Sequence, residues 1–218
     1  MPYHGKILLG LTGNIACGKS TILKQLGKLG AHTVDADALV HRVQARGGPA
    51  YWPVVSEFGP GIVAEGGEID RRALGQLVFA NAKRLRRLEE IVHPIVRKEI
   101  DRDIAEAEEA VVVLDAIKLF ESGWADRCDE VWVVTCPREA QIERLMEKRG
   151  FSREDAEMRI DAQTPQAEKA ERASVVIENS GTPASLRAQV EAAWRDFHAL
   201  HRGEQAVTEP AAPASEPE

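Results

Sequence analysis

The sequence lacks the features typical of membrane proteins, secreted proteins and nucleic-acid-binding proteins. No apolar segment approaches the roughly 20 residues that a membrane-spanning helix needs, so we expect no membrane partner. The first six residues run straight into an apolar stretch, so we expect no signal peptide. Basic residues are outnumbered, with 28 Lys and Arg against 35 Asp and Glu, and the net charge of −7 argues against a general nucleic-acid binder.

Cysteine is scarce as well. The three cysteines, Cys17, Cys128 and Cys136, are odd in number and scattered, so they predict neither a disulfide framework nor a zinc site. Together with the expected lack of a signal peptide, this predicts a reduced, cytoplasmic enzyme. We expect it to be a monomer or a small homo-oligomer.

The most informative segment present is the glycine-rich stretch at residues 13–20. It reads Gly-Asn-Ile-Ala-Cys-Gly-Lys-Ser and fits the phosphate-binding P-loop pattern G-x-x-x-x-G-K-S. The apolar run at 7–11 predicts a buried strand before it, and apolar residues at helical spacing over 21–29 predict a helix after it. Strand, glycine loop and helix are the context that this motif requires, so we predict a nucleotide site rather than a chance glycine-rich turn.

The residues of the loop predict how ATP and Mg²⁺ are held. Gly13 and Gly18 let the backbone turn its N–H groups towards phosphate, and the helix N-terminus adds partial positive charge. Lys19 can reach the β- and γ-phosphates, and the Ser20 hydroxyl can ligate Mg²⁺. The predicted nucleotide-binding residues are Gly13, Asn14, Ile15, Ala16, Cys17, Gly18, Lys19, Ser20 and Thr21.

Strand and helix patterns alternate along the rest of the chain. Further strands are predicted at 31–34, 110–114, 131–134 and 174–177. Helices are predicted at 38–45, 51–58, 70–79, 82–109, 137–149, 153–163 and 183–200. Because no strand pattern occurs between 50 and 110, we expect a parallel sheet with right-handed crossovers and one helical insertion.

Phosphoryl transfer needs a carboxylate near the acceptor hydroxyl, and the chain has two candidates. No guanine-reading N-K-x-D is present, which argues against a GTPase. Asp35 and Asp37 end the second predicted strand, at the edge where open α/β sheets bind ligands, and share a face if the strand continues through them. One can take a proton while the other supports Mg²⁺ or the loop; alternatively, the pair only caps the next helix.

Positive charge for the moving phosphoryl group has several candidates. One group of arginines lies on two predicted helices and consists of Arg144, Arg149, Arg153 and Arg159. These can clamp phosphates, but interleaved glutamates also allow solvated faces with pairs four residues apart. Arg71 in the insertion is ambiguous in the same way, and His93 can contact a ligand or simply pack.

Taken in order, these motifs resemble the dephospho-CoA kinase family over about residues 7–181. The matching segments are GLTG at 10–13, VDAD at 34–37, DRRAL at 70–74, VHPIV at 92–96, LFESG at 119–123, QIERL at 141–145, RG at 149–150, RIDAQ at 159–163 and NSG at 179–181. The P-loop alone is generic, whereas the D-A-D, H-P and R-I-x-x-Q elements in this order are specific.

The resemblance implies transfer of the γ-phosphate of ATP to the ribose 3′-hydroxyl of dephospho-CoA, the last step of coenzyme A synthesis. It implies an α/β fold in three layers, the P-loop kinase fold, with a five-stranded parallel sheet, a helical CoA-binding insertion and a helical lid. By position, Asp37 matches the catalytic base, Lys19 matches the ATP site, and Arg144 matches a lid arginine that stabilises the transferring phosphate.

The resemblance also divides the chain. The predicted nucleotide-binding core spans 1–47 and 110–202, with a lid at about 138–165, and the insertion spans 48–109. Residues 203–218 hold four Glu, three Pro and no Lys or Arg, and we interpret them as a disordered acidic tail. The acceptor is expected to contact Asp35, Asp37, Arg71, His93 and Lys118.

Two positions depart from the family pattern. Ile117 stands where the family usually has proline, so that Lys118 brings a charge close to the expected acceptor site, and Ser174 stands where Asp is usual. A P-loop kinase for another small hydroxyl acceptor, such as a nucleoside, is therefore the alternative. A nucleotide-dependent binding protein without phosphoryl transfer is a third hypothesis.

Overall fold

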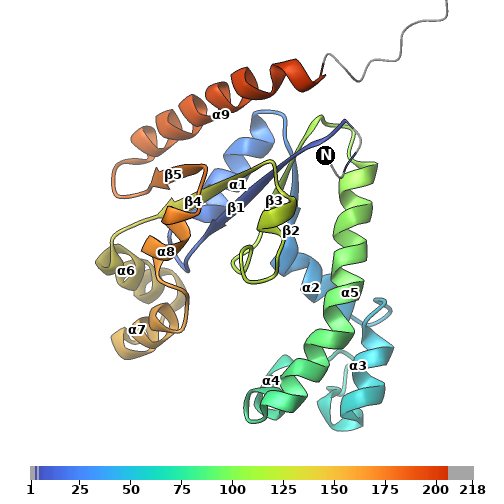
Figure 1. The fold of residues 1–218 in the computed structure, drawn as a ribbon. Coiled ribbons are helices and arrows are strands. Elements are labelled where there is room, and N and C mark those ends of the chain that lie inside the picture. The colour runs from blue at the N-terminus through green and yellow to red at the C-terminus, as the bar shows by residue number, and fades with distance from the viewer. Residues whose placement is uncertain (1–2, 4, 206–218) are drawn as a thin grey trace, which may run out of the picture. The chain divides into compact units, whose positions relative to one another are not determined.

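A computed structural model describes residue 3 and residues 5–205, and its central element is a five-stranded sheet (Figure 1). The strand order is β2-β3-β1-β4-β5. The strands are β1 (Ile7–Gly13), β2 (His32–Asp35), β3 (Val111–Asp115), β4 (Glu130–Thr135) and β5 (Val175–Glu178). All five predicted strands are thus confirmed, with ends displaced by one or two residues. β4 pairs in parallel with both β1 and β5, so that Trp132 lies between Leu11 and Val175.

Burial explains why the central strands are continuously apolar. Every residue of β1 and β3 is buried, whereas the edge strands β2 and β5 expose half of theirs. A strand covered on both faces has no reason to alternate apolar and polar residues. The continuous runs that predicted these strands are therefore the direct signature of their position in the sheet.

The chain divides by its contacts into two units. The P-loop unit, as we call it, comprises the chain up to Thr33, Glu109–Val113 and the chain from Ile117 onward; the helical unit comprises Val34–Glu108 and Leu114–Ala116. Apart from residue 109, the predicted insertion at 48–109 falls within the helical unit, but that unit also contains residues 34–47 and 114–116, which were predicted to belong to the core.

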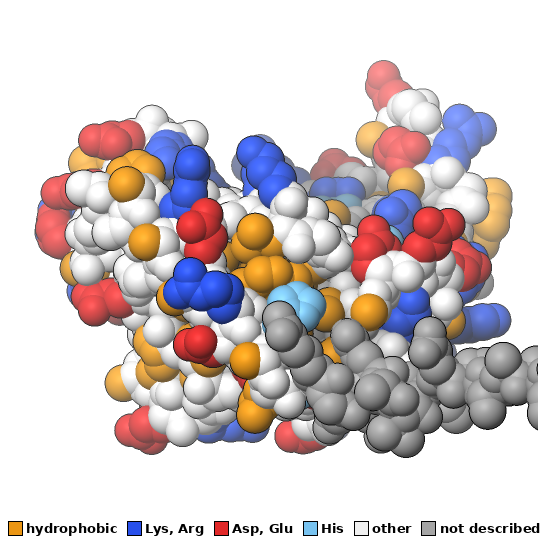
Figure 2. Space-filling model, turned by 90° about the horizontal axis from the view of Figure 1, so that it is seen from above, with side chains coloured by type: hydrophobic (Ala, Val, Ile, Leu, Met, Phe, Trp, Pro, Cys, Tyr) orange, Lys and Arg blue, Asp and Glu red, His pale blue; other side chains and the backbone are white. Residues whose placement is uncertain are grey.

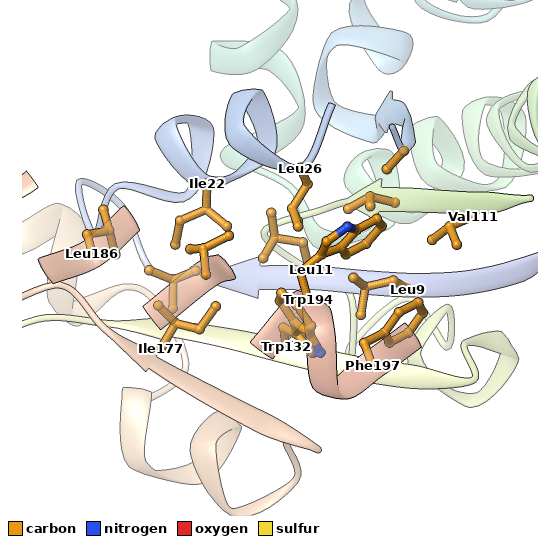
Figure 3. Packing of buried hydrophobic residues seen from close by; sticks show 14 of the residues in the cluster. Leu9, Leu11, Ile22, Leu26, Val111, Trp132, Ile177, Leu186, Trp194 and Phe197 are labelled. Atoms are coloured by element: carbon orange, nitrogen blue, oxygen red, sulfur yellow. The ribbon is translucent and has the colours of Figure 1, made fainter. Parts of the chain in front are cut away.

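In the P-loop unit, two helices cover one face of the sheet. They are α1 (Lys19–Lys28) and α9 (Pro183–Gln205). Figure 3 shows Ile22 and Leu26 of α1 in the same cluster as Trp194 and Phe197 of α9. The rings of Trp194 and Phe197 are stacked with centroids 5.5 Å apart, a favourable aromatic arrangement. This packing fixes α1, and with it the end of the P-loop, against the sheet.

Three shorter helices follow β4 in the P-loop unit: α6 (Arg138–Arg149), α7 (Arg153–Asp161) and α8 (Gln166–Glu171). α6 and α7 share a small core with Phe151 at its edge, made of Ile142, Leu145, Ala156 and Ile160. α7 ends two residues before its predicted end. The helix α8 was not predicted at all, because six residues without an apolar period give no helical signal. A short 3₁₀ turn, η2 (Ala125–Arg127), lies between β3 and β4.

The helical unit is built around one long helix. It contains α2 (Ala36–Gln44), α3 (Tyr51–Phe58), η1 (Pro60–Ile62), α4 (Arg71–Phe79) and α5 (Ala82–Glu106). α2, α3 and α4 pack on α5, whose buried residues Val92, Val96, Ile100 and Ile104 recur every four positions. The predicted N-cap Asp70 is confirmed, since its Oδ1 accepts hydrogen bonds from the N–H groups of Arg72 and Ala73.

Two predicted ends differ from the structure. The long helix continues through Pro94 but ends at Glu106 rather than at residue 109. α9 continues to Gln205, so the first three residues of the predicted tail are helical, and 206–218 lie outside the described residues. Between 50 and 110, all of which is described, the sole strand-like feature is an isolated bridge between Val63 and Ile69. None of the described helices combines the length and the apolar character needed to cross a bilayer.

Candidate active site

The P-loop connects β1 to α1 through three residues with positive φ. They are Gly13 at 155°, Ala16 at 61° and Gly18 at 96°. At Gly13 a Cβ atom would lie 2.5 Å from the carbonyl oxygen of Val134, and at Gly18 it would collide with the Asn179 side chain. Glycine is therefore required at both ends of the loop by close approach as well as by backbone conformation.

The N-terminus of α1 has no cap of its own. Gly18 occupies the N-cap position, no side chain caps the helix, and its first turn contains no acidic residue. The first-turn N–H groups of a helix need an external partner and carry partial positive charge. This end of α1 therefore fits a phosphate, and Lys19 and the exposed Ser20 hydroxyl stand in its first turn, as a nucleotide with Mg²⁺ requires.

Three consecutive carbonyl groups of the loop are each held by a side chain from elsewhere. Ile15 O accepts from Gln141 Nε2 at 2.7 Å, Ala16 O from Arg144 Nη1 at 3.0 Å, and Cys17 O from Asn179 Nδ2 at 2.8 Å. We call Gln141, Arg144 and Asn179 the carbonyl brace. All peptide bonds are trans in the described residues, so each N–H points opposite to the preceding carbonyl. The brace thereby turns the N–H groups of Ala16 and Gly18 away from itself, to where a phosphate can accept them.

The segment after α7 holds the loop from a further direction. Ile15 N–H donates to Gln163 Oε1 at 2.8 Å, and Asn14 Nδ2 donates to the carbonyl of Thr164 at 2.9 Å. The other amide atom of the Asn14 side chain, Oδ1, is buried without a hydrogen-bond partner. The loop conformation is therefore over-determined, and the nucleotide does not have to order it.

The arginines that the sequence left ambiguous have different environments. Arg144 joins the loop to β5 by donating to Ala16 O and to Asn179 O. Arg153 makes exposed ion pairs with Glu139 and, four residues on, with Glu157, so the interpretation as a solvated face is correct for it. Arg159 stacks over Phe151 with 4.4 Å between Cζ and the ring centroid.

Lys169 on α8 is a buried cation that the sequence analysis missed. It is 2% exposed, donates to the carbonyl of Ile117 at 3.0 Å, and lies 3.8 Å from Glu121 Oε1. Burial lowers the pKa of Lys169, and the neighbouring Glu121 opposes that shift. The carbonyl of Ile117 also accepts from Thr12 Oγ1 at 3.1 Å. Since only the backbone of Ile117 is used, the loss of the usual proline leaves these bonds intact, and Lys118 beside it is exposed.

The acidic pair of the helical unit is arranged differently from the prediction. β2 ends at Asp35, whose Oδ1 caps α2 by accepting from Ala38 N–H at 2.9 Å. Asp37 therefore lies in the first turn of α2. The prediction that a strand carries both side chains on one face is wrong. The capping alternative is correct for Asp35, and the Asp37 carboxylate is exposed.

Arg71 and His93 also lie in the helical unit. Arg71 opens α4 and His93 lies on α5 directly before Pro94, and both side chains are exposed. His93 is therefore not a packed core histidine. The structure places the P-loop, Arg144 and Lys118 in one unit and Asp35, Asp37, Arg71 and His93 in the other.

Several site residues carried no role in the sequence analysis. Gln141, Gln163 and Asn179 stood inside matching motifs without an assigned contact, and Gln166 and Lys169 stood in a stretch without any motif. The available signal was weak, because a glutamine or lysine on a helix is ordinarily solvated.

Comparisons with known proteins agree with this geometry. The family model for dephospho-CoA kinase matches residues 7–185. The dephospho-CoA kinase of Symbiobacterium thermophilum is 49% identical over 203 residues, which cover 92% of this chain and 85% of the relative. The dephospho-CoA kinase of Geobacter sulfurreducens is 45% identical over 190 residues, which cover 86% of this chain and 96% of the relative.

Solved structures give the same picture. A Thermus thermophilus protein superposes with a TM-score of 0.78 at 37% identity, covering 89% of this chain and 97% of its own. The dephospho-CoA kinase from Campylobacter jejuni superposes with a TM-score of 0.66 at 27% identity, covering 89% and 98%. Shikimate kinase from Acinetobacter baumannii, at 15% identity and a TM-score of 0.51, shares the fold.

Proposed function

This chain belongs to the dephospho-CoA kinase family, and from that premise we propose how its residues divide the work of the reaction. The enzyme transfers the γ-phosphate of ATP to dephospho-CoA, with Mg²⁺ as cofactor, giving coenzyme A and ADP in the final step of coenzyme A biosynthesis. The observation that carries the assignment of roles is the carbonyl brace, because it fixes loop N–H groups in an orientation that suits a phosphate.

On the nucleotide side, the loop from Gly13 to Thr21 binds the phosphates of ATP. Its N–H groups and those at the uncapped N-terminus of α1 donate to the phosphate oxygens, and Lys19 neutralises the charge on the β- and γ-oxygens. Ser20 offers its hydroxyl to Mg²⁺, which draws off charge from the phosphates when bound. The brace is already in place, so little reorganisation accompanies the transfer.

On the acceptor side, Asp37 positions the ribose 3′-hydroxyl and accepts its proton. Asp35 holds the start of α2 through its capping bond, and with Arg71, His93 and Lys118 it contacts the acceptor. The exposure of Asp37, Arg71 and His93 supports this assignment, since a side chain that is not packed in the core can contact a ligand. Because phosphoryl transfer has a loose transition state, Asp37 acts more by positioning than by strong base catalysis.

Arg144 serves both the loop and the transferring group. Two of its guanidinium nitrogens donate to the carbonyls of Ala16 and Asn179, and five N–H donors are available in all. The remaining donors and the positive charge stabilise the charge on the moving phosphoryl group.

We extend the proposal to the organisation and setting of the protein. The P-loop unit, which holds the predicted core apart from residues 34–47 and 114–116, binds the nucleotide, the lid at about 138–165 covers it, and the insertion at 48–109 binds the CoA moiety. The enzyme acts in the cytoplasm as a monomer or small homo-oligomer without nucleic-acid partners. The net charge of −7 supports the last point, as does the mixture of basic and acidic side chains on the face in Figure 2.

The test is Mg²⁺- and ATP-dependent ADP release measured in parallel with dephospho-CoA, AMP, adenosine and no acceptor. We expect strong stimulation by dephospho-CoA alone, with coenzyme A as the product. Stimulation by adenosine or AMP instead would keep the kinase mechanism and identify the segment at Ile117 and Lys118 as a specificity change. ATP binding without stimulation by any acceptor would contradict the proposal.

A further inference from the structure

Two thiols far apart in the sequence meet behind the P-loop. Cys17 lies within the loop and Cys136 directly follows β4, and their Sγ atoms are 3.0 Å apart. Both are free cysteines, 0% and 6% exposed respectively. The mechanism uses the backbone of Cys17 but neither thiol, so this pair has no part in phosphoryl transfer.

The side chain of Gln166 holds the two cysteines in place. It pairs with the backbone of Cys136 through both amide atoms, accepting from its N–H and donating to its C=O at 3.0 Å each. Gln166 Oε1 also accepts from the Cys17 thiol at 3.2 Å. The loop, the end of β4 and α8 are thereby joined around the two sulfur atoms, so the contact between them is built into the fold.

The environment makes the two thiols unequal. With both thiols protonated, Cys136 Sγ donates to Cys17 Sγ and the Cys17 thiol donates to Gln166 Oε1. When Cys136 ionises, the Cys17 thiol can turn to the Cys136 thiolate instead, and this bond, assisted by the nearby Arg144, lowers the pKa of Cys136. The same contact and burial raise the pKa of Cys17. Cys136 is therefore the group that ionises, and a thiolate with a neighbouring thiol is the arrangement found in redox-sensitive pairs.

Cys136 lies beside a hollow in the surface. A surface hollow of about 280 Å³ is lined by Cys136 together with Pro137, Gln166 and Glu178. The third cysteine differs, because its Sγ donates to the carbonyl of Trp124 and burial raises the pKa of Cys128 to about 12. Cys128 thus provides a matched internal control for reactivity.

We propose that Cys17 and Cys136 form a reversible disulfide when the enzyme meets a hydroperoxide, and that this bond switches off the nucleotide site. The Cys136 thiolate attacks one oxygen of hydrogen peroxide and the O–O bond breaks, leaving a sulfenic acid and a hydroxide that takes up a proton. The Cys17 sulfur then attacks the sulfenic sulfur, expelling water with the proton of its own thiol. In total, two thiols are oxidised and one peroxide is reduced to two waters.

The consequence for the P-loop follows from geometry. A disulfide bond is about 2.0 Å long, so the two sulfurs must approach by about 1 Å from their present separation. Cys17 cannot move without disturbing its carbonyl, which Asn179 holds. Because misplacement by about 1 Å in a catalytic site can cost about 100-fold in rate, we expect a loss of that order. This regulation rests on the proposed function of the loop as the ATP site.

The experiment treats the full-length enzyme with hydrogen peroxide and follows mass, ATP binding and activity. We expect a mass lower by two hydrogen atoms, a linked peptide pair containing Cys17 and Cys136, and an about 100-fold loss of activity that dithiothreitol reverses. In a dithiothreitol redox buffer, saturation with Mg²⁺-ATP should lower the fraction of linked enzyme at equilibrium, because two events that oppose each other do so reciprocally.

Two variants sharpen the test. Cys136→Ala should keep its basal activity and resist peroxide, and Cys136→Ser serves if the alanine variant folds poorly. Cys128→Ala should keep both basal activity and sensitivity. The proposal is overturned if no Cys17–Cys136 linkage forms, if linked enzyme retains full activity, or if Cys136→Ala remains as sensitive as the wild type. The mass readout needs no kinase activity, so it separates this outcome from failure of the proposed function.

Discussion

The P-loop and the acceptor-side residues of the helical unit are held in opposite ways. Three successive carbonyls of the loop are fixed by Gln141, Arg144 and Asn179, whereas Asp37 and His93 stand exposed on helix surfaces. In the roles that we propose, the nucleotide side is ordered by the fold before any ligand arrives, and the acceptor side presents side chains for the ligand itself to engage. Substitutions in the two regions should therefore fail for different reasons.

The largest effect is expected in the loop at Lys19. Lys19→Ala should lower kcat by about 1000-fold or more, because it removes the charge that neutralises the β- and γ-oxygens of ATP. Steady-state ADP release measures this, with thermal unfolding to show that the fold persists. Lys24→Ala, an exposed change on the same helix, is the matched control and should leave kcat unchanged. Near-normal kcat in Lys19→Ala would remove the P-loop assignment.

The acceptor side is tested by comparing Asp37 with Asp35. Asp37→Asn should fold normally and lower kcat by about 100-fold with little change in ATP affinity, because it loses the proton acceptor. Asp35→Asn should lose much less, since asparagine caps a helix as well as aspartate does. Measuring kcat together with the Kd for ATP separates the two roles.

Equal losses in the two variants would contradict the assignment of a single base. A shared fall in thermal stability would instead show that both carboxylates act through the start of α2. Asp35→Ala is the useful addition, because it removes the capping bond that Asp35→Asn retains.

A smaller effect is expected at Arg144, which both belongs to the carbonyl brace and is proposed to stabilise the moving phosphoryl group. Arg144→Ala should lower kcat by roughly tenfold to 100-fold with a modest change in ATP affinity, since the charge acts mainly in the transition state. The split between kcat and KM decides the role. A pure KM effect would make Arg144 a binding residue that holds Ala16 O, and Arg153→Ala, whose exposed ion pairs place it on a solvated face, is the control.

The smallest effect is expected from removal of residues 206–218. A chain ending at Gln205 retains the whole of α9 and loses the acidic segment that we assign no catalytic part. Its kcat and KM should equal those of the full-length enzyme. A fall in kcat or a rise in KM would show that this segment contributes to the site.

Much of this protein follows from local patterns in its sequence. The apolar runs predict β1, β3 and β4 because buried parallel strands need no polar face, and Asp70 predicts the start of α4 because its carboxylate can accept from the first N–H groups of the helix. The P-loop pattern likewise identifies Gly13, Gly18, Lys19 and Ser20, since the turn of the loop and the chemistry of phosphate and Mg²⁺ demand those residue types.

Tertiary structure alone decided the rest, because it depends on groups that are distant in the chain. Gln141 contacts Ile15 across 126 positions, and nothing in a glutamine on a polar helix distinguishes that bond from hydration. The six residues of α8 carry no helical pattern of their own, and the helix packs against β4, a neighbour that is distant in the sequence. Cys17 and Cys136, which look scattered at 119 residues apart, become neighbours because two adjacent strands, β1 and β4, end side by side.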